Sequence, residues 1–306
     1  MYNFWKGFWL MAQPKIWIAS TVPLLVGTAL AYGMTGMFNF YWFVISMIGL
    51  YFIEIGKNAL NDLVDYLTGV DLAVAPENLT PFSGGRNRVL VKGYLSLHDA
   101  VFIIITTLTI GGAFGLYITI YHEPHIFWIG SLGLFLAVAY SLPPLKFAYR
   151  GLGEIAVGIA FGPLIVSGAF VIQAHFLTGK VFLVSLPIGF LIANFLFINQ
   201  YPDYEADKKY HKNNWLVRLG KDKGIIVFIT LFALAYLSII ILAISTRNPF
   251  WLLSFLSLPL VIQAVRTVIL SKGKIPELLA ANICTLRVYQ INGLFMLVSA
   301  VATRFL

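Results

Sequence analysis

Long apolar runs separated by short polar segments dominate the chain. A helix that crosses a bilayer needs about 20 mostly apolar residues. Nine segments meet this criterion, at 14–33, 39–57, 98–119, 124–142, 152–174, 180–199, 224–245, 249–270 and 286–304. Several of them contain Gly or Pro, which neighbouring helices tolerate in a membrane. The pattern predicts an all-α integral membrane protein with nine transmembrane helices.

Composition supports the same class. Of the 306 residues, 59% are hydrophobic and 11% are charged, whereas a soluble domain carries about 25% charged residues. We interpret residues 1–306 as one transmembrane domain without a cleavable signal peptide, because the first apolar run lacks a convincing small-residue cleavage site. The single cysteine, Cys284, cannot form an internal disulfide.

The net charge of +8 has a membrane explanation, because Lys and Arg concentrate in cytoplasmic loops. With the N-terminus in the cytoplasm, the outer segments hold Lys180, Arg247 and Arg304. The inner segments hold Lys6, Lys15, Arg86, Arg88, Lys92, Lys146, Arg150, Lys208, Lys209, Lys212, Arg218, Lys221, Lys223, Lys272 and Lys274. This bias predicts a cytoplasmic N-terminus in a multi-pass protein, expected in the plasma membrane of a prokaryote. It also argues against a nucleic-acid partner.

Two acidic clusters follow predicted spans on the cytoplasmic side. The stretch NDLVD at 61–65 follows the second span, and DYEAD at 203–207 follows the sixth. Helical spacing places the first cluster on one stripe with Asn58, and it places Asp203 one turn from Asp207. We therefore expect both clusters to meet at one site, at the mouth of a central cavity that opens to the cytoplasm.

Two facing carboxylate clusters repel each other unless a cation lies between them. Oxygen ligands without His or Cys favour Mg²⁺, which also takes ligands from substrate phosphates. The Lys and Arg residues nearby would then surround a polyanion. The alternatives are that the acidic residues are only solvated and that the cations only anchor the loops.

The motifs resemble those of the UbiA superfamily of intramembrane prenyltransferases. The resemblance covers nearly the whole chain and is closest to the branch that prenylates 1,4-dihydroxy-2-naphthoate. Its segments are NDLVD at 61–65, GVD at 69–71, YRGLGE at 149–154, FGP at 161–163, DYEAD at 203–207 and VRLG at 217–220. The chain departs from the family at QPK, 13–15, where members often have Arg-Pro. It also has DKKYHKNN at 207–214, where a stretch like DRxAGKRT is usual.

The resemblance implies a nine-helix fold and an Mg²⁺-dependent enzyme in menaquinone biosynthesis. The implied partners are a polyprenyl diphosphate as donor, an aromatic acceptor and the lipid bilayer. Other acceptors in the superfamily remain open, including 4-hydroxybenzoate, homogentisate and a glyceryl phosphate lipid. Outside the superfamily, an ion-coupled transporter or a non-catalytic scaffold remains an alternative.

Within this hypothesis each site residue receives a role. The expected metal ligands are Asn61, Asp65, Asp203 and Asp207. The expected catalytic residues are Asp65, Asp203, Asp207 and Lys146. The expected substrate-binding residues are Asn58, Asp62, Asp71, Arg86, Arg88, Lys146, Arg150, Tyr140, Glu154 and Lys15. Among these, Lys146, Arg150 and Arg86 or Arg88 would neutralise the departing diphosphate, Tyr140 would steady the allylic cation, Glu154 would face the acceptor, and Lys15 would replace the missing Arg.

Overall fold

The apolar segments form helices because a backbone in hydrocarbon must satisfy its hydrogen bonds internally. The computed structural model describes residues 2–82 and 87–306, and every regular element in these ranges is helical. The α-helices are α1 (Phe4–Ala12), α2 (Ile18–Thr35), α3 (Phe40–Thr68), α4 (Val70–Ala73), α5 (Leu97–Tyr121), α6 (Ile126–Ala139), α7 (Gly153–Ile159), α8 (Ile165–Ala174), α9 (Gly179–Ile198), α10 (Tyr204–Lys209), α11 (Trp215–Thr246), α12 (Leu258–Ser271) and α13 (Ile275–Ala302). Single turns and short helices of other types are η1 (Pro14–Ile16), η2 (Pro76–Asn78), η3 (Phe147–Tyr149), the π-helical η4 (Ala160–Leu164), η5 (Pro249–Ser257) and η6 (Thr303–Phe305). The prediction of an all-α protein is confirmed.

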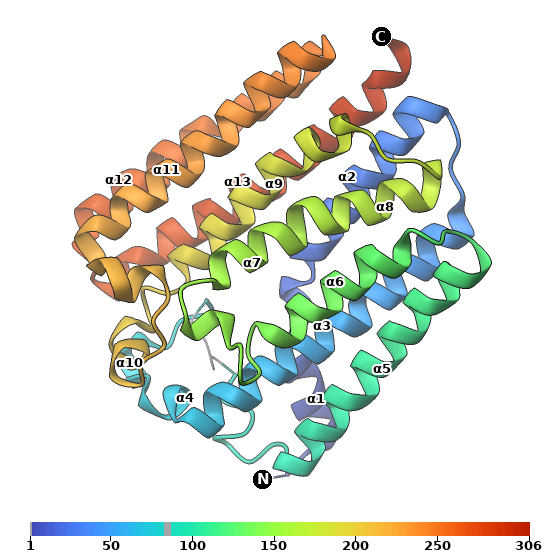
Figure 1. The fold of residues 1–306 in the computed structure, drawn as a ribbon. Helices are drawn as coiled ribbons and strands as arrows, with labels where there is room; N and C mark the ends of the chain where they lie inside the picture. The colour runs from blue at the N-terminus through green and yellow to red at the C-terminus, as the bar shows by residue number, and fades with distance from the viewer. Residues whose placement is uncertain (1, 83–86) are drawn as a thin grey trace.

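In the described ranges, eight helical segments are long and apolar enough to cross a membrane. Figure 1 shows the long helices side by side, with the short helices α4 and α10 at one end of the bundle. Helix α6 corresponds to the predicted span 124–142 but has only 14 residues, which is about 21 Å against a hydrocarbon core of about 30 Å. The chain is therefore an integral membrane protein, and nine crossings remain a prediction.

Two helices begin earlier than the apolar pattern predicts. Helix α11 begins at Trp215 instead of 224, and α13 begins at Ile275 instead of 286. The side chain of Asn214 caps α11 by accepting a hydrogen bond from the backbone N–H of Val217, and α11 is kinked at Gly220, whose φ is 79°. Hydropathy marks only the part of a helix that suits hydrocarbon, so polar first turns lie outside the predicted span.

The largest apolar core is formed mainly by α2, α8, α9, α11 and α13. Within it, η4 approaches α9 so closely that a Cβ atom at Gly162 would lie 2.9 Å from the Cα atom of Gly189. Gly162 is the central residue of the FGP segment. A glycine is therefore required there because the two backbones touch.

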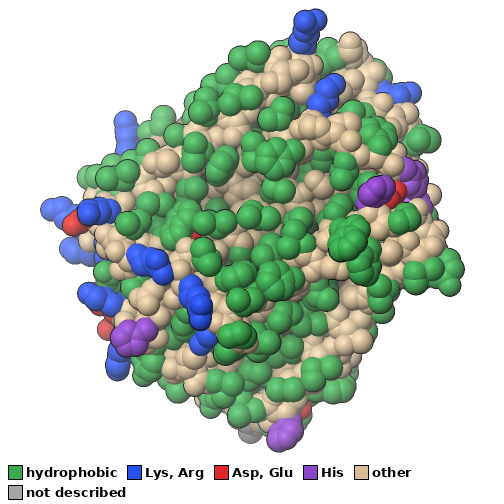
Figure 2. Space-filling view, viewed as in Figure 1, with side chains coloured by type: hydrophobic (Ala, Val, Ile, Leu, Met, Phe, Trp, Pro, Cys, Tyr) green, Lys and Arg blue, Asp and Glu red, His purple; other side chains and the backbone are tan. Residues whose placement is uncertain are grey.

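The outer surface of the bundle is largely apolar. Figure 2 shows hydrophobic side chains across most of one face, while Lys and Arg gather mainly at the end that carries α10. Large side chains such as Trp128 and Ile244 are more than 70% exposed. Exposed apolar area of this extent is unfavourable in water but is solvated by lipid tails.

Candidate active site

The first acidic cluster lies on the last turns of α3. This helix has 29 residues and is therefore about 43 Å long, which exceeds a hydrocarbon core of about 30 Å. Asn61, Asp62 and Asp65 fall in its C-terminal third. The excess length carries these polar side chains to one end of the bundle.

The second cluster lies between α9 and α11, at the same end of the bundle (Figure 1). Asp203 precedes the first residue of α10, and Asp207 lies within this short helix and is buried. Asn214 donates a hydrogen bond from Nδ2 to Oδ2 of Asp207, at 2.7 Å. Since Asn214 also caps α11, the start of α11 fixes the position of the Asp207 carboxylate.

Both clusters line one cavity of about 930 Å³. The lining residues from the first cluster and its helix are Asn58, Asn61, Asp62 and Asp65. Those from the second cluster are Asp203 and Asp207. Side chains of α5, α6, η4 and α8 line the rest of the cavity, and these are almost entirely apolar. The cavity thus has a polar end and a body that is mostly apolar, apart from Glu54 and Lys57 of α3.

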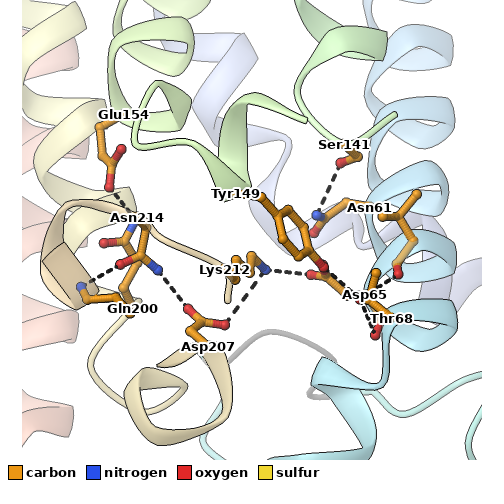
Figure 3. Close-up of polar contacts among 12 residues, drawn as sticks. Asn61, Asp65, Thr68, Ser141, Tyr149, Glu154, Gln200, Asp207, Lys212 and Asn214 are labelled. Atoms are coloured by element: carbon orange, nitrogen blue, oxygen red, sulfur yellow. Dashed lines mark hydrogen bonds and ion pairs between the residues drawn. The ribbon is translucent and has the colours of Figure 1, made fainter. Parts of the chain in front are cut away.

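A lysine side chain lies between the two clusters. Nζ of Lys212 is 2.7 Å from Oδ2 of Asp65 and 4.0 Å from Oδ1 of Asp207, as Figure 3 shows. Burial opposes the charge of Lys212, but the carboxylates of Asp65 and Asp207 outweigh this effect and raise its pKa. A protein cation therefore already occupies the space where the two clusters face each other.

Tyr149 also holds the side chain of Asp65. The hydroxyl of Tyr149 donates to Oδ1 of Asp65 at 2.7 Å and lies 2.7 Å from Oγ1 of Thr68. Tyr149 belongs to η3, and the Nζ atom of Lys146 lies 3.9 Å from the centre of its ring. Burial lowers the pKa of Lys146. Lys146 therefore reaches the site through Tyr149 and does not line the cavity.

Two carboxyl groups outside the membrane-spanning helices have raised pKa values. Burial, with a smaller contribution from Asp65, raises the pKa of Asp207 to about 7. Burial and repulsion by Asp65 and Asp62 raise the pKa of Asp71 to about 9. Asp71 is buried in α4 and, unlike Asp207, does not line the cavity.

The remaining polar residues of α3 contact other helices or loops. Nε2 of Gln13 donates to the carboxylate of Asp62 at 3.3 Å. Nδ2 of Asn61 donates to Oγ of Ser141 at 3.2 Å. These contacts join the residue before η1 and the loop after α6 to the polar end of the cavity.

Tyr140 and Glu154 line the same cavity. Oε1 of Glu154 accepts hydrogen bonds of 2.8 Å from Nε2 of Gln200 and from the backbone N–H of Trp215. Glu154 therefore joins the start of α7 to the start of α11, as well as facing the cavity.

Several predicted cations lie away from the cavity lining. Arg150 is exposed and donates to the backbone carbonyl of Pro144 at 2.7 Å. Lys15 is exposed on η1, and Arg88 is half-buried with a φ of 48°. Arg86 lies outside the described residues. Among the described residues, Lys212 is the lysine that lies between Asp65 and Asp207.

The comparison with protein families identifies the fold and its chemistry. The model of the UbiA prenyltransferase family matches residues 20–286. The chain belongs to this family. It is therefore a prenyltransferase, and the predicted resemblance is confirmed.

Curated relatives agree with the predicted branch. The chain is 29% identical to 2-carboxy-1,4-naphthoquinone phytyltransferase of Synechocystis over 86% of this chain and 83% of that protein. It is 27% identical to 1,4-dihydroxy-2-naphthoate octaprenyltransferase of Bacillus subtilis, over 84% of this chain and 80% of that protein. Both relatives are named for a naphthoquinone or naphthoate substrate and for a prenyl group.

Solved structures agree with the fold. A UbiA homologue from Archaeoglobus fulgidus bound to GPP and Mg²⁺ has a TM-score of 0.68 and 18% identity, over 98% of this chain and all of that chain. The apo structure of a UbiA homologue from Aeropyrum pernix has a TM-score of 0.67 and 18% identity, over 92% of this chain and 96% of that chain. At this identity the likeness shows that the fold is shared.

The oxygen-rich end of the cavity fits a divalent cation. In the described ranges no three His, Cys, Asp or Glu side chains lie close enough together to hold a metal ion by themselves. A hard cation that also takes ligands from asparagine, water and a substrate diphosphate does not need such a group. The ammonium group of Lys212 between Asp65 and Asp207 shows that this space accommodates positive charge.

Sequence reasoning missed three residues of this network: Lys212, Asn214 and Gln200. Lys212 is one of several lysines in a single basic loop, and spacing alone does not distinguish it from Lys208 or Lys209. Asn214 carried a usable signal, because an Asn directly before an apolar helix is a typical N-cap. Gln200 carried none, since its partner Glu154 is 46 residues away in the sequence.

Proposed function

We propose that this enzyme transfers a polyprenyl group from a polyprenyl diphosphate to an aromatic acceptor in an Mg²⁺-dependent reaction. The observation that carries this proposal is the single cavity with an acidic end and an apolar body. A polyprenyl diphosphate has the same division, since its head is a polyanion and its tail is hydrocarbon. A bound metal offsets the repulsion between the acidic end and the diphosphate.

Asn61, Asp65, Asp203 and Asp207 are the residues that would hold Mg²⁺. When bound, the ion supplies positive charge to the leaving diphosphate. Asn58 and Asp62 lie on the same helix and line the same end of the cavity. Lys212 supplies a further positive charge at this end, and Lys146 adds a weaker one from behind Tyr149.

The reaction breaks the bond between C1 of the prenyl group and the diphosphate oxygen, and the electron pair leaves with the diphosphate. A π-electron pair of the acceptor ring forms the new bond to C1. The ring then loses a proton, or loses its carboxyl group as CO₂, and the electron pair of that broken bond restores aromaticity. Tyr140 lines the cavity, and an aromatic face there would stabilise a cation.

We propose 1,4-dihydroxy-2-naphthoate as the acceptor, which places the enzyme in menaquinone biosynthesis. The names of the relatives at 27% and 29% identity support this choice. The gathering of Lys and Arg around α10 (Figure 2) supports a cytoplasmic position for the polar end. We further propose nine crossings, a cytoplasmic N-terminus and a prokaryotic plasma membrane.

Purified enzyme in vesicles tests the proposal. It is incubated with Mg²⁺, a series of polyprenyl diphosphates, and 1,4-dihydroxy-2-naphthoate in competition with 4-hydroxybenzoate and homogentisate. Lipid extraction should yield prenylated naphthoquinol, and EDTA should abolish it. Preferential prenylation of another acceptor would overturn the assignment of 1,4-dihydroxy-2-naphthoate, and product formation in EDTA would overturn the role of Mg²⁺.

A further inference from the structure

An ion pair lies inside the membrane-spanning helix α3. Glu54 is 2% exposed, and its Oε2 atom is 3.0 Å from Nζ of Lys57. Oγ of Ser20 donates a hydrogen bond to Oε1 of Glu54. Both members of the pair line the cavity. Ionisable side chains within a spanning helix are costly, and they usually mark a site that uses them.

The pair lies on the same helical face as the proposed metal ligands, but deeper in the bundle. Glu54 and Lys57 are three positions apart, Lys57 and Asn61 four, and Asn61 and Asp65 four, so they share one stripe of α3. At 1.5 Å per residue, Lys57 lies about 6 Å and Glu54 about 10 Å from Asn61 along the helix axis. A donor whose diphosphate lies at the acidic end directs its C1 atom toward this depth, so the acceptor ring must lie here too.

The surroundings of Lys57 suit a planar anion. Its Nζ atom is 3.1 Å from Oδ1 of Asn58 and 5.1 Å from the ring centre of Phe161. An ammonium group has three N–H donors, and Glu54 and Asn58 engage two. The side chain is 24% exposed, and Phe161 also lines the cavity. A ligand in the cavity can therefore reach the ammonium group beside an aromatic face.

We propose that Lys57 binds the carboxylate of an aromatic acid acceptor. Glu54 compensates the charge of Lys57 when the acceptor is absent, because a lone buried cation is strongly destabilising. Recognition by Lys57 favours an aromatic acid over a neutral phenol or quinol of the same shape. This inference rests on the proposed function, because Lys57 would select the acceptor of that reaction.

Equilibrium binding without catalysis tests the proposal. Purified protein in EDTA, without donor, is titrated with fluorescent 1-hydroxy-2-naphthoate and with 1-naphthol, which lacks the carboxylate. The Lys57→Met variant should bind the acid on the order of tenfold more weakly and bind 1-naphthol as the unmodified protein does. The Lys57→Arg variant should retain most of the preference for the acid. Equal losses for both probes, or no loss for the acid, would overturn the proposal.

The Glu54→Gln variant separates anchoring from simple structural support. The substitution removes the carboxylate that pairs with Lys57 but keeps the shape of the side chain. The variant should therefore bind the acid at least as tightly as the unmodified protein. A loss in Glu54→Gln as large as that in Lys57→Met would show that the pair acts only as a structural unit. Selective acid binding through Lys57 without prenyl transfer would contradict the proposed function alone. Prenylation of 1,4-dihydroxy-2-naphthoate that is unchanged in Lys57→Met would contradict this inference alone.

Discussion

The ammonium group of Lys212 lies 2.7 Å from the Oδ2 atom of Asp65, although 147 positions of the chain separate the two residues. The same group is 4.0 Å from Oδ1 of Asp207, so one lysine joins the acidic clusters of α3 and α10. Its side chain is 14% exposed and that of Asp65 is 3% exposed, which places the contact where solvent screens it little. The two clusters are thus joined by a charge that belongs to the protein itself.

Replacement of Lys212 by Met should destabilise the protein when no metal is present. Breaking a buried ion pair by removing one partner leaves an uncompensated charge and costs on the order of 3 kcal/mol. Thermal unfolding in detergent with EDTA should therefore show a lower Tm for Lys212→Met. Mg²⁺ should raise the Tm of this variant more than that of the unmodified protein, because Asp65 and Asp207 no longer share a lysine.

Lys208→Met provides the matched control, since Lys208 is an exposed lysine of α10, four positions before Lys212. Its Tm should change little in EDTA or in Mg²⁺. An unchanged Tm for Lys212→Met in EDTA would contradict the argument that Lys212 holds the clusters together.

Replacement of Asp65 or Asp207 by Asn should nearly abolish prenyl transfer. Asn preserves the shape of the side chain and removes the negative charge that a metal needs. We expect kcat/KM to fall on the order of 100-fold or more, measured by extraction of prenylated product over a range of Mg²⁺ concentrations. Asp99→Asn is the control, because Asp99 is part of the capping box at the start of α5. Activity in Asp65→Asn equal to that of Asp99→Asn would remove Asp65 from the mechanism.

Much of the fold follows from hydropathy, because the period and length of an apolar run determine a spanning helix. The ends of the helices are predicted less well from hydropathy, as the early start of α13 at Ile275 shows. The meeting of the two acidic clusters follows from loop charge and helix order. The side-chain partners within the site could not be predicted from the sequence. Contacts such as that between Lys212 and Asp65 depend on side-chain directions that sequence spacing leaves open.

One departure from the family pattern is explained by backbone conformation. His211 stands where the family stretch usually has Gly, and its φ is 57°. This is the left-handed region that glycine adopts readily and other residues adopt at a cost of about 1–2 kcal/mol. His211 therefore adopts a backbone conformation that a glycine adopts readily, and Lys212 follows it directly.

Replacement of Tyr149 by Phe should weaken the use of Mg²⁺. The Tyr149 hydroxyl donates to Oδ1 of Asp65, and partners that orient a metal ligand typically contribute 10- to 100-fold in metal affinity or activity. We expect the Mg²⁺ concentration that gives half-maximal activity to rise about tenfold. Tyr66→Phe, one residue after Asp65 on α3, is the control. The same Mg²⁺ dependence in both variants would show that the hydroxyl does not position Asp65.

Asp71 should make the folded protein less stable as the pH rises. Burial and repulsion by Asp65 and Asp62 raise its pKa from an ordinary value of 3.8 to about 9. Between these values the folded chain keeps a proton that the unfolded chain has lost, so the free energy of unfolding falls with rising pH, by at most about 1.4 kcal/mol per pH unit. The pKa of Asp207, at about 7, gives a slope of the same sign that ends near pH 7. The interval from pH 7 to 9 therefore separates the effect of Asp71 from that of Asp207.

Thermal unfolding in EDTA at pH 6, 7, 8 and 9 measures this slope. The unmodified protein should lose Tm steadily from pH 7 to 9, whereas Asp71→Asn, which carries no titratable group at this position, should lose much less and be the more stable protein at pH 9. Glu205→Gln serves as a control, because the Glu205 side chain is 70% exposed and should leave the slope unchanged. If Asp71→Asn follows the same curve as the unmodified protein, the buried carboxyl group of α4 is not the source of the pH dependence. A Tm that does not change between pH 7 and 9 would mean that Asp71 is already ionised in the folded protein at pH 7, because a carboxyl group ionised in both the folded and the unfolded chain contributes no slope.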